Sequence, residues 1–366
     1  MDFGFTQEQE GLRDAARSLL ADRAGAGSLR AMFSAPDGTD RGLWDAIVAL
    51  GWTSLTVPES LGGLGRGLVE LAIVQEELGR HLAPVPFFST VGLAASAAAT
   101  PAFLEGIVGG RIATLAATER DGSWQRCRTT ATPDRASGGW VLTGLKHHVC
   151  EAHLADDVVV SARTLKGASL FVVPTSALRR APRPAETIDP GRRLSTITLS
   201  GVTVQRDQLV GAEGAAQPLI DAAMDRAAVA LAAEAVGVAS GALELAVAYA
   251  KTREQFGRPI GAYQAVAHRC ADMYAAVESA RSAVHYAAWA LDESVPDAKL
   301  AVATAKVAAN EAVRLATTGC VQVHGGIGFT WEHDAHLYFR RGRFCETFLG
   351  ASSRWRDRVV ALRVAS

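Results

Sequence analysis

Apolar residues recur at three- and four-residue spacing near both ends of the chain, which predicts helices in these regions. The first predicted helix covers residues 6–24, where Thr6 and Gln9 have the spacing of a capping box. A break rich in Gly, Ser and Asp follows at about 34–41. Small apolar residues over 86–110 predict one or two short helices. Two further helices are predicted between the break and this segment, at 43–50 and 68–78.

The pattern changes at about residue 111. From Ile112 to Val210, apolar residues alternate with polar ones or form short runs, broken by Gly, Pro and Asp, which predicts strands. About a hundred residues is an ordinary domain size, so these strands predict one β domain. They lie in the runs IATLAAT, WVLTGL, DVVVSART, SLFVVP and STITLSGVTV.

From Pro218 onward the chain is rich in alanine, the residue with the highest helix propensity. Long helices with short connections predict a four-helix bundle. The predicted helices are 217–251, 261–292, 297–322, 331–345 and 353–364. The fold class is therefore α+β, with an N-terminal helical domain (1–110), a central β domain (111–212) and a C-terminal helical bundle (213–366).

Composition narrows the possible functions. The chain has 366 residues, 49% of them hydrophobic, and a net charge of -1, which does not favour nucleic acid or an anionic membrane surface as a partner. Its 5 cysteines are scattered, without the paired spacing of a metal site, and are expected to be reduced. The N-terminus lacks an apolar signal core, and charges interrupt the apolar runs. We therefore expect a cytoplasmic protein without membrane insertion.

Residues 253–273 carry the first motif with chemical content. Arg253, Gln255 and Phe256 precede a turn built from glycines and Pro259, and a long helix follows. Arginine binds phosphate through two parallel hydrogen bonds, and helix N-termini attract anions, so the arrangement suits a phosphate-bearing ligand. A helical hairpin with a solvated arginine is the alternative interpretation of this stretch taken alone.

A second motif, Gln322-Val-His-Gly-Gly326, follows in the last third of the chain. Together, Arg-x-x-Phe-Gly-x-Pro-Ile-x-x-x-Gln and Gln-Val-His-Gly-Gly resemble two motifs of the acyl-CoA dehydrogenase family, in the family's order and separation. The resemblance extends from Phe5 to about Val364. It implies the family's fold, an FAD cofactor, an acyl-CoA thioester substrate and an electron-transferring flavoprotein as the electron acceptor.

In this family a carboxylate removes the α-proton of the thioester while the β-hydride passes to the flavin. The family places this glutamate in one of two positions, and both are empty in this sequence. Leu349 occupies the C-terminal position, and Ala227 occupies the alternative position on the long helix before Arg253. Ala228 stands where the family has an arginine that contacts CoA. The resemblance therefore predicts no catalytic residue in this chain.

Three other carboxylates could replace the missing base. They are Glu346, Asp225 and Glu234. A general base must lie within hydrogen-bonding reach of the proton that it removes. We expect each of them to be a solvated or structural charge.

The resemblance divides the flavin-binding residues into two groups. Arg253, Gln255, Phe256, Gln322, Gly325 and Gly326 match positions that reach the FAD of a neighbouring subunit. Thr118 matches a contact to the subunit's own flavin. The segment that holds the family's own flavin platform instead contains Lys146, His148 and Cys150, so the aromatic ring and the hydroxyl are replaced.

This chain thus keeps the residues that serve a neighbour's flavin and loses those that serve its own chemistry. It resembles the base-lacking subunits of heteromeric acyl-CoA dehydrogenases of actinobacterial steroid and lipid degradation. We expect a heterotetramer with a sister subunit, or a homo-oligomer. The alternatives are a self-sufficient flavoenzyme with a relocated base, acting as a dehydrogenase, oxidase or monooxygenase, and a non-enzymatic acyl-CoA-binding scaffold.

The remaining histidines predict no metal site. His147, His148 and His153 lack supporting carboxylate or cysteine spacing and are expected on a β-hairpin surface. His324 is expected to pack, whereas His333 and His336 are expected to be solvated on one helix face. Met273 and Trp289 are expected in the core.

Overall fold

The computed structural model describes residues 4–364 and divides into two compact units. The first unit contains residues 1–34, 67–84 and 228–366, and the second contains 35–66 and 85–227. The boundary between residues 227 and 228 falls inside one continuous helix, α7 (Gln217–Thr252). The three domains inferred from the sequence pattern, 1–110, 111–212 and 213–366, remain a prediction.

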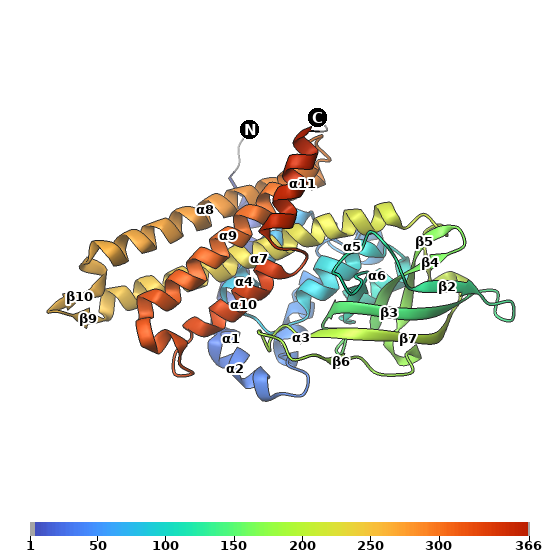
Figure 1. Ribbon diagram of the computed structural model, residues 1–366, viewed down its shortest axis with the longest axis horizontal. Helices are drawn as coiled ribbons and strands as arrows, with labels where there is room; N and C mark the ends of the chain where they lie inside the picture. The colour runs from blue at the N-terminus through green and yellow to red at the C-terminus, as the bar shows by residue number, and fades with distance from the viewer. Residues whose placement is uncertain (1–3, 365–366) are drawn as a thin grey trace. The chain divides into compact units, whose positions relative to one another are not determined.

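The first unit is a helical bundle, in which α8 and α9 lie side by side along their length (Figure 1). Its elements are α1 (Gln7–Arg23), α2 (Ala26–Ser34), α4 (Leu68–Arg80), most of α7, β9 (Glu254–Gln255), β10 (Arg258–Pro259), α8 (Gln264–Asp292), α9 (Ala298–His324), α10 (Ala335–Thr347) and α11 (Ser352–Val364). The predicted capping box is confirmed, because the Thr6 hydroxyl accepts from the Gln9 N–H while the Gln9 side chain accepts from the Thr6 N–H. Helix α2 was not predicted, since glycines surround its start.

Glycines allow α4 and α7 to cross in direct backbone contact. A Cβ atom on Gly79 would lie 2.3 Å from the Glu234 carbonyl oxygen, and one on Gly237 would lie 1.8 Å from the Glu76 carbonyl oxygen. Any larger side chain would force the helices apart. The Glu76-Glu77-x-Gly79 segment therefore shapes the fold.

Helix α7 is the one helix in the described part of the chain that is long and apolar enough to cross a membrane. Its apolar stretch is 89% buried, as in the core helix of a folded domain. The burial explains why alanine and valine follow each other on all faces of this helix rather than on one stripe.

The second unit is built around a mixed sheet. Strands follow the order β6-β7-β3-β2-β4-β5-β8, and β1 pairs in parallel with β4. The strands are β1 (Ala113–Ala116), β2 (Thr130–Pro133), β3 (Trp140–Cys150), β4 (Asp157–Thr164), β5 (Gly167–Pro174), β6 (Arg183–Pro184), β7 (Leu194–Val204) and β8 (Leu209–Val210). The predicted runs fall on β1, β3, β4, β5 and β7, whereas the short strands β2, β6 and β8 were missed.

Short helical segments complete this unit. They are α3 (Arg41–Ala49), a π-helical stretch (Phe88–Ala94), α5 (Ala95–Ala97) and α6 (Pro101–Val108). Helix α3 ends before Gly51, whose φ of 74° is left-handed, as the sequence predicted. The core lies along β4, where Val158, Val159 and Val160 are all fully buried, so both faces of this central strand are covered.

Candidate functional site

The first motif forms a short hairpin between α7 and α8. Gln255 pairs with Arg258 across the two strands, and Phe256 occupies the turn with a left-handed φ of 53°. The Phe256 side chain is 93% exposed. The Tyr263 hydroxyl donates to the Gln255 carbonyl at 3.1 Å and so ties the hairpin to the start of α8.

Arg253 begins this hairpin with its side chain in solvent. Its backbone is fixed, because its N–H donates to the Tyr249 carbonyl and its own carbonyl accepts from the Ile260 N–H, both at 2.8 Å. Within residues 4–364 no ion pair or hydrogen bond engages its guanidinium. A held backbone with a free guanidinium suits an arginine that binds an anion from outside the chain.

The second motif lies where α9 ends. Gln322, Gly325 and Gly326 are all exposed. The backbone of Gly325 is left-handed, with φ 64° and ψ -140°, and no atom lies within 4 Å of a Cβ built on Gly325 or Gly326. A ligand can therefore approach this backbone closely, which side chains would prevent.

The structure brings the two motifs to the same end of the helical bundle, where α7 and α9 end and α8 begins (Figure 1). The Tyr249 ring, four residues before Arg253, stacks on the His324 ring at 4.3 Å between centroids. His324 also lies 4.1 Å from the His333 ring. The expectation that His324 packs is confirmed, and burial lowers its pKa.

The expected surroundings of three side chains were wrong: His333 and His336 were expected to be solvated on one helix face, and Trp289 to lie in the core. His333 precedes α10 rather than lying on its face, and it belongs to the His324 stack. His336 is buried, and the Trp331 ring packs edge-on against it at 4.7 Å between centroids. Trp289 is only half-buried beside Tyr286, whereas Met273 is fully buried as expected.

Both positions of the family's base are apolar and buried. Leu349 is 8% exposed and has a left-handed φ of 61°, just before Gly350. Ala227 and Ala228 are fully buried within α7. None of the three side chains can accept a proton.

A buried lysine that sequence reasoning missed supports the Leu349 turn. The Lys306 ammonium donates to the Asn310 side chain at 2.6 Å and to the Cys345 carbonyl at 2.7 Å, and Asn310 reaches the Gly350 carbonyl. Burial lowers the pKa of Lys306 to about 8. A lysine followed by asparagine one turn later in an alanine-rich helix was the available signal.

The three substitute carboxylates are all engaged elsewhere. Glu234 is fully buried and accepts from Arg341 at 3.1 Å and from Gln75 at 2.8 Å. Glu346 accepts from Arg343 at 2.5 Å on the same helix. Asp225 is buried and has polar partners of its own. These interactions favour structural roles.

In the β unit, Thr118 is buried and its hydroxyl donates to the His147 carbonyl, while the His147 N–H donates back to the Thr118 carbonyl at 3.0 Å. This exchange ties the end of β1 to β3. The resemblance predicts that Thr118 contacts the flavin, but its hydroxyl already donates to a carbonyl within the chain. His148 is exposed, with its ring 3.3 Å from the Arg120 carbonyl, and His153 lies 2.9 Å from the Asp37 carbonyl.

Backbone strain marks three of the positions identified from the sequence. Six non-glycine residues in the described part have a positive φ, and His148, Phe256 and Leu349 are among them. His148 lies where β3 shifts register against β7. Such conformations are costly for residues with side chains and persist where the surroundings fix them, often at functional sites.

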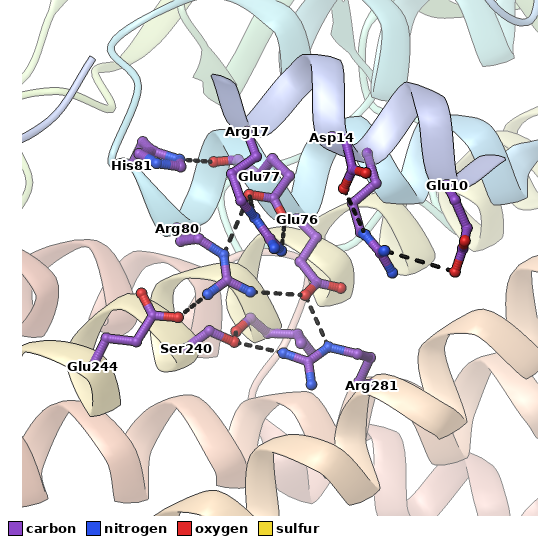
Figure 2. A network of polar contacts seen from close by, with 12 residues as sticks. Glu10, Asp14, Arg17, Glu76, Glu77, Arg80, His81, Ser240, Glu244 and Arg281 are labelled. Atoms are coloured by element: carbon purple, nitrogen blue, oxygen red, sulfur yellow. Dashed lines mark hydrogen bonds and ion pairs between the residues drawn. The ribbon is translucent and has the colours of Figure 1, made fainter. Parts of the chain in front are cut away.

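A separate cavity of about 850 Å³ opens between α1, α4, α7 and α8. Charged side chains at this cavity form a network of polar contacts, in which Arg281 donates to Glu76 at 2.9 Å and to Ser240 at 2.8 Å, and Arg17 donates to Glu77 at 2.7 Å (Figure 2). These charged side chains pair with one another across the helices, so the network holds the helices together. Among residues 4–364, no group of three or more His, Cys, Asp or Glu side chains is placed to hold a metal ion.

Comparison with known proteins agrees with this geometry. Residues 6–105 match the acyl-CoA dehydrogenase N-terminal domain, and residues 217–361 match the acyl-CoA dehydrogenase C-terminal domain. The chain is 36% identical over 336 residues to the acyl-CoA dehydrogenase IpdE2 of Mycobacterium tuberculosis, covering 92% of this chain and 91% of that protein.

Solved structures with two differently named chains are also similar. The crystal structure of the ChsE4-ChsE5 complex from Mycobacterium tuberculosis gives a TM-score of 0.91 at 30% identity, with 100% of both chains covered. The Tcur3481-Tcur3483 steroid ACAD gives 0.88 at 34% identity, covering 98% of this chain and 99% of that one. These findings confirm the predicted fold, the oxidoreductase class and FAD as the cofactor of this fold. The chain belongs to the acyl-CoA dehydrogenase family.

Proposed function

We propose that this chain is the base-lacking subunit of a heteromeric, FAD-dependent acyl-CoA dehydrogenase and completes the FAD site of a sister subunit. The observation that carries the proposal is the contrast between two regions. The Arg253 guanidinium is free at the bundle end, whereas Leu349 and Ala227 close both base positions. The sister subunit would supply the glutamate that removes the α-proton of the acyl-CoA thioester.

The residues at the bundle end fit the diphosphate and adenosine portions of FAD. Arg253 would bind the diphosphate through its two parallel N–H donors, and the open backbone at Gly325 and Gly326 would let it approach closely. Gln255, Phe256 and Gln322 complete the exposed surface at these motifs. When bound, FAD supplies the acceptor for the β-hydride.

The β unit fits the flavin ring less well. The Thr118 hydroxyl already donates to the His147 carbonyl, and His148 replaces the family's aromatic platform. This chain would therefore bind FAD mainly as a neighbour's cofactor. The similarity to the ChsE4-ChsE5 complex and to a steroid ACAD supports a site shared between two different chains. It also supports a bulky acyl group as the substrate.

The proposed partners follow from the same reasoning. They are an acyl-CoA thioester, a sister chain in a heterotetramer and an electron-transferring flavoprotein that takes the electrons onward. We place the protein in the cytoplasm, in fatty acid or steroid degradation.

Flavin content and size test the proposal. The chain is purified alone and again after co-expression with a base-carrying sister chain, and its FAD:protein ratio and mass are measured by absorbance and light scattering. We expect little flavin alone and a yellow heterotetramer with the sister chain. Stoichiometric FAD and dehydrogenase turnover in the chain alone would contradict it and would favour a homo-oligomer with a relocated base.

A further inference from the structure

Four side chains of the β unit form a compact cluster that the proposed function does not use, and three of them, Glu119, Lys146 and Ser161, are buried. The fully buried Lys146 ammonium lies 2.8 Å from a Glu119 oxygen, 2.9 Å from the Ser161 hydroxyl and 3.5 Å from the Cys127 sulfur. An ammonium has three N–H donors, so these three neighbours account for all of them. Lys146 and Cys127 are therefore held side by side.

Cys127 differs from the other cysteines in its surroundings. Burial raises the pKa of Cys320 to about 12 and also raises the pKa of Cys270. Cys150 and Cys345 are buried. Cys127 is half-buried, and its sulfur lies 3.5 Å from the Lys146 ammonium while its thiol donates to the Ser161 carbonyl at 3.3 Å. Oxidation of a cysteine depends on its exposure, so a small oxidant can reach this thiol.

Cys127 and Lys146 belong to different elements of the β unit. Cys127 lies in the connection between β1 and β2, residues 117–129, none of which belongs to a strand. Lys146 is fixed in β3, opposite Ile197 of β7. A bond between the sulfur and the nitrogen, which lie 3.5 Å apart, would therefore join a strand to a connecting segment.

We propose that Cys127 and Lys146 are a modification site at which hydrogen peroxide produces a covalent sulfur–nitrogen cross-link. In the first step the thiol is oxidised to sulfenic acid, and peroxide is reduced to one water. In the second step Lys146 gives a proton to Glu119, and its nitrogen attacks the sulfur. The S–N bond forms, the S–O bond breaks, and the hydroxyl leaves as a second water with one of the two protons left on nitrogen, so the nitrogen of the cross-link keeps one proton.

Glu119 makes this chemistry possible inside the protein. Its carboxylate is buried, accepts from Lys146 and also accepts from the Arg128 N–H at 2.9 Å. When it takes the proton of the ammonium, both buried charges disappear together. The cross-linked state then leaves no unpaired charge in the interior, which would otherwise be costly.

The cross-link lies beside Thr118, the predicted contact to the subunit's own flavin, because Glu119 follows Thr118 in the sequence. It would join β3 to the segment before β2 by a bond instead of hydrogen bonds. The inference does not depend on the proposed function, because it concerns residues of one unit and is measured without flavin.

Intact mass spectrometry and thiol counting test the cross-link. The wild-type chain is treated with a small excess of hydrogen peroxide, then denatured and alkylated without reductant. We expect a mass lower by two hydrogen atoms, 4 of the 5 cysteines alkylated, and a peptide that joins Cys127 to Lys146. A disulfide would lose the same mass but would leave only 3 alkylated cysteines. Dithiothreitol should restore the original mass.

Matched variants separate this site from general oxidation. Cys127→Ser should lose the mass change, and Cys270→Ser should keep it, since Cys270 is the other half-exposed cysteine. Lys146→Arg, which keeps the charge, should gain oxygen on Cys127 instead. Gain of oxygen on Cys127 without a cross-link in the wild type, or the mass loss in Cys127→Ser, would overturn the proposal even if Lys146→Arg does not fold.

Discussion

The His324 ring stacks on the Tyr249 ring at 4.3 Å between centroids, and this contact joins the ends of two helices that each carry one family motif. Tyr249 lies four residues before Arg253, and His324 immediately precedes Gly325. The stack therefore fixes the spacing of two segments that lie far apart in the sequence.

Acid should weaken this stack. Burial lowers the pKa of His324 below its ordinary value of 6.5, and His333 beside it adds to the shift. As pH falls below about 6.5, the unfolded imidazole takes up a proton before the folded one, so the free energy of unfolding falls. His324→Gln should lose part of this pH dependence in urea denaturation at pH 7.0 and 5.0. An unchanged dependence would exclude His324 as its source.

Removing the free guanidinium should affect the cofactor and not the fold. Arg253→Ala should leave the melting temperature of the isolated chain within about 1 °C, since exposed substitutions change stability by less than about 0.5 kcal/mol. In the co-expressed complex it should lower FAD retention at least about tenfold, the loss expected from one charge-assisted contact. Arg258→Ala, on the same hairpin, is the control. Equal FAD retention in both variants would contradict the role proposed for Arg253.

The crossing of α4 and α7 should not tolerate a methyl group. Gly237→Ala would place Cβ 1.8 Å from the Glu76 carbonyl oxygen, so we expect a loss of about 3 kcal/mol in the free energy of unfolding. Gly11→Ala is the matched control, because nothing lies within 4 Å of its Cβ in α1. It should be neutral or stabilise by up to about 1 kcal/mol through helix propensity. Chemical denaturation of both variants measures the difference.

Glu76 should carry much of the acid sensitivity of the helical unit. Burial alone would raise the pKa of this carboxyl, but the His285 ring 3.5 Å away and the charge of Arg281, which donates to Glu76 at 2.9 Å, outweigh burial and lower it from 4.5 to about 2. Its contribution to stability is present above pH 4.5 and is lost as pH falls toward 2.

Glu76→Gln should therefore lower the free energy of unfolding at pH 7 by on the order of 3 kcal/mol. The variant should also lose less stability than the wild type between pH 5 and pH 3. Glu278→Gln is the control, since Glu278 pairs with the same Arg281 but is 44% exposed. Equal effects of both substitutions at pH 7 would show that burial of Glu76 does not matter.

Local sequence predicted the elements whose signal is strong along the chain. The helices from Gln217 onward and strand β4 carry many alanines or valines in unbroken runs, so propensity and burial agree. The motifs at Arg253 and Gln322 also identified the exposed bundle end. Helix α2, by contrast, starts among glycines, and its Arg30 binds the Asp334 side chain at 2.7 Å, a partner 304 residues away.

The less predictable parts of the site depend on such distant contacts. His336 is buried by Trp331, and Lys306 holds a carbonyl of a different helix. The His336 environment has no signature in neighbouring residues, and the spacing of Lys306 and Asn310 does not reveal the distant Cys345 carbonyl. The pairing of Cys127 with Lys146 likewise arises only when the segment before β2 folds against β3.

The exposed aromatic side chains at the bundle end have a consequence for how the cell makes this protein. Phe256 is 93% exposed, Phe329 is 77% exposed and Trp331 is 58% exposed. Apolar surface of this kind promotes aggregation unless another surface covers it. If the proposed sister chain covers this surface, a copy made without it would be a target for chaperones and proteases, and the two chains would have to be synthesised in matched amounts.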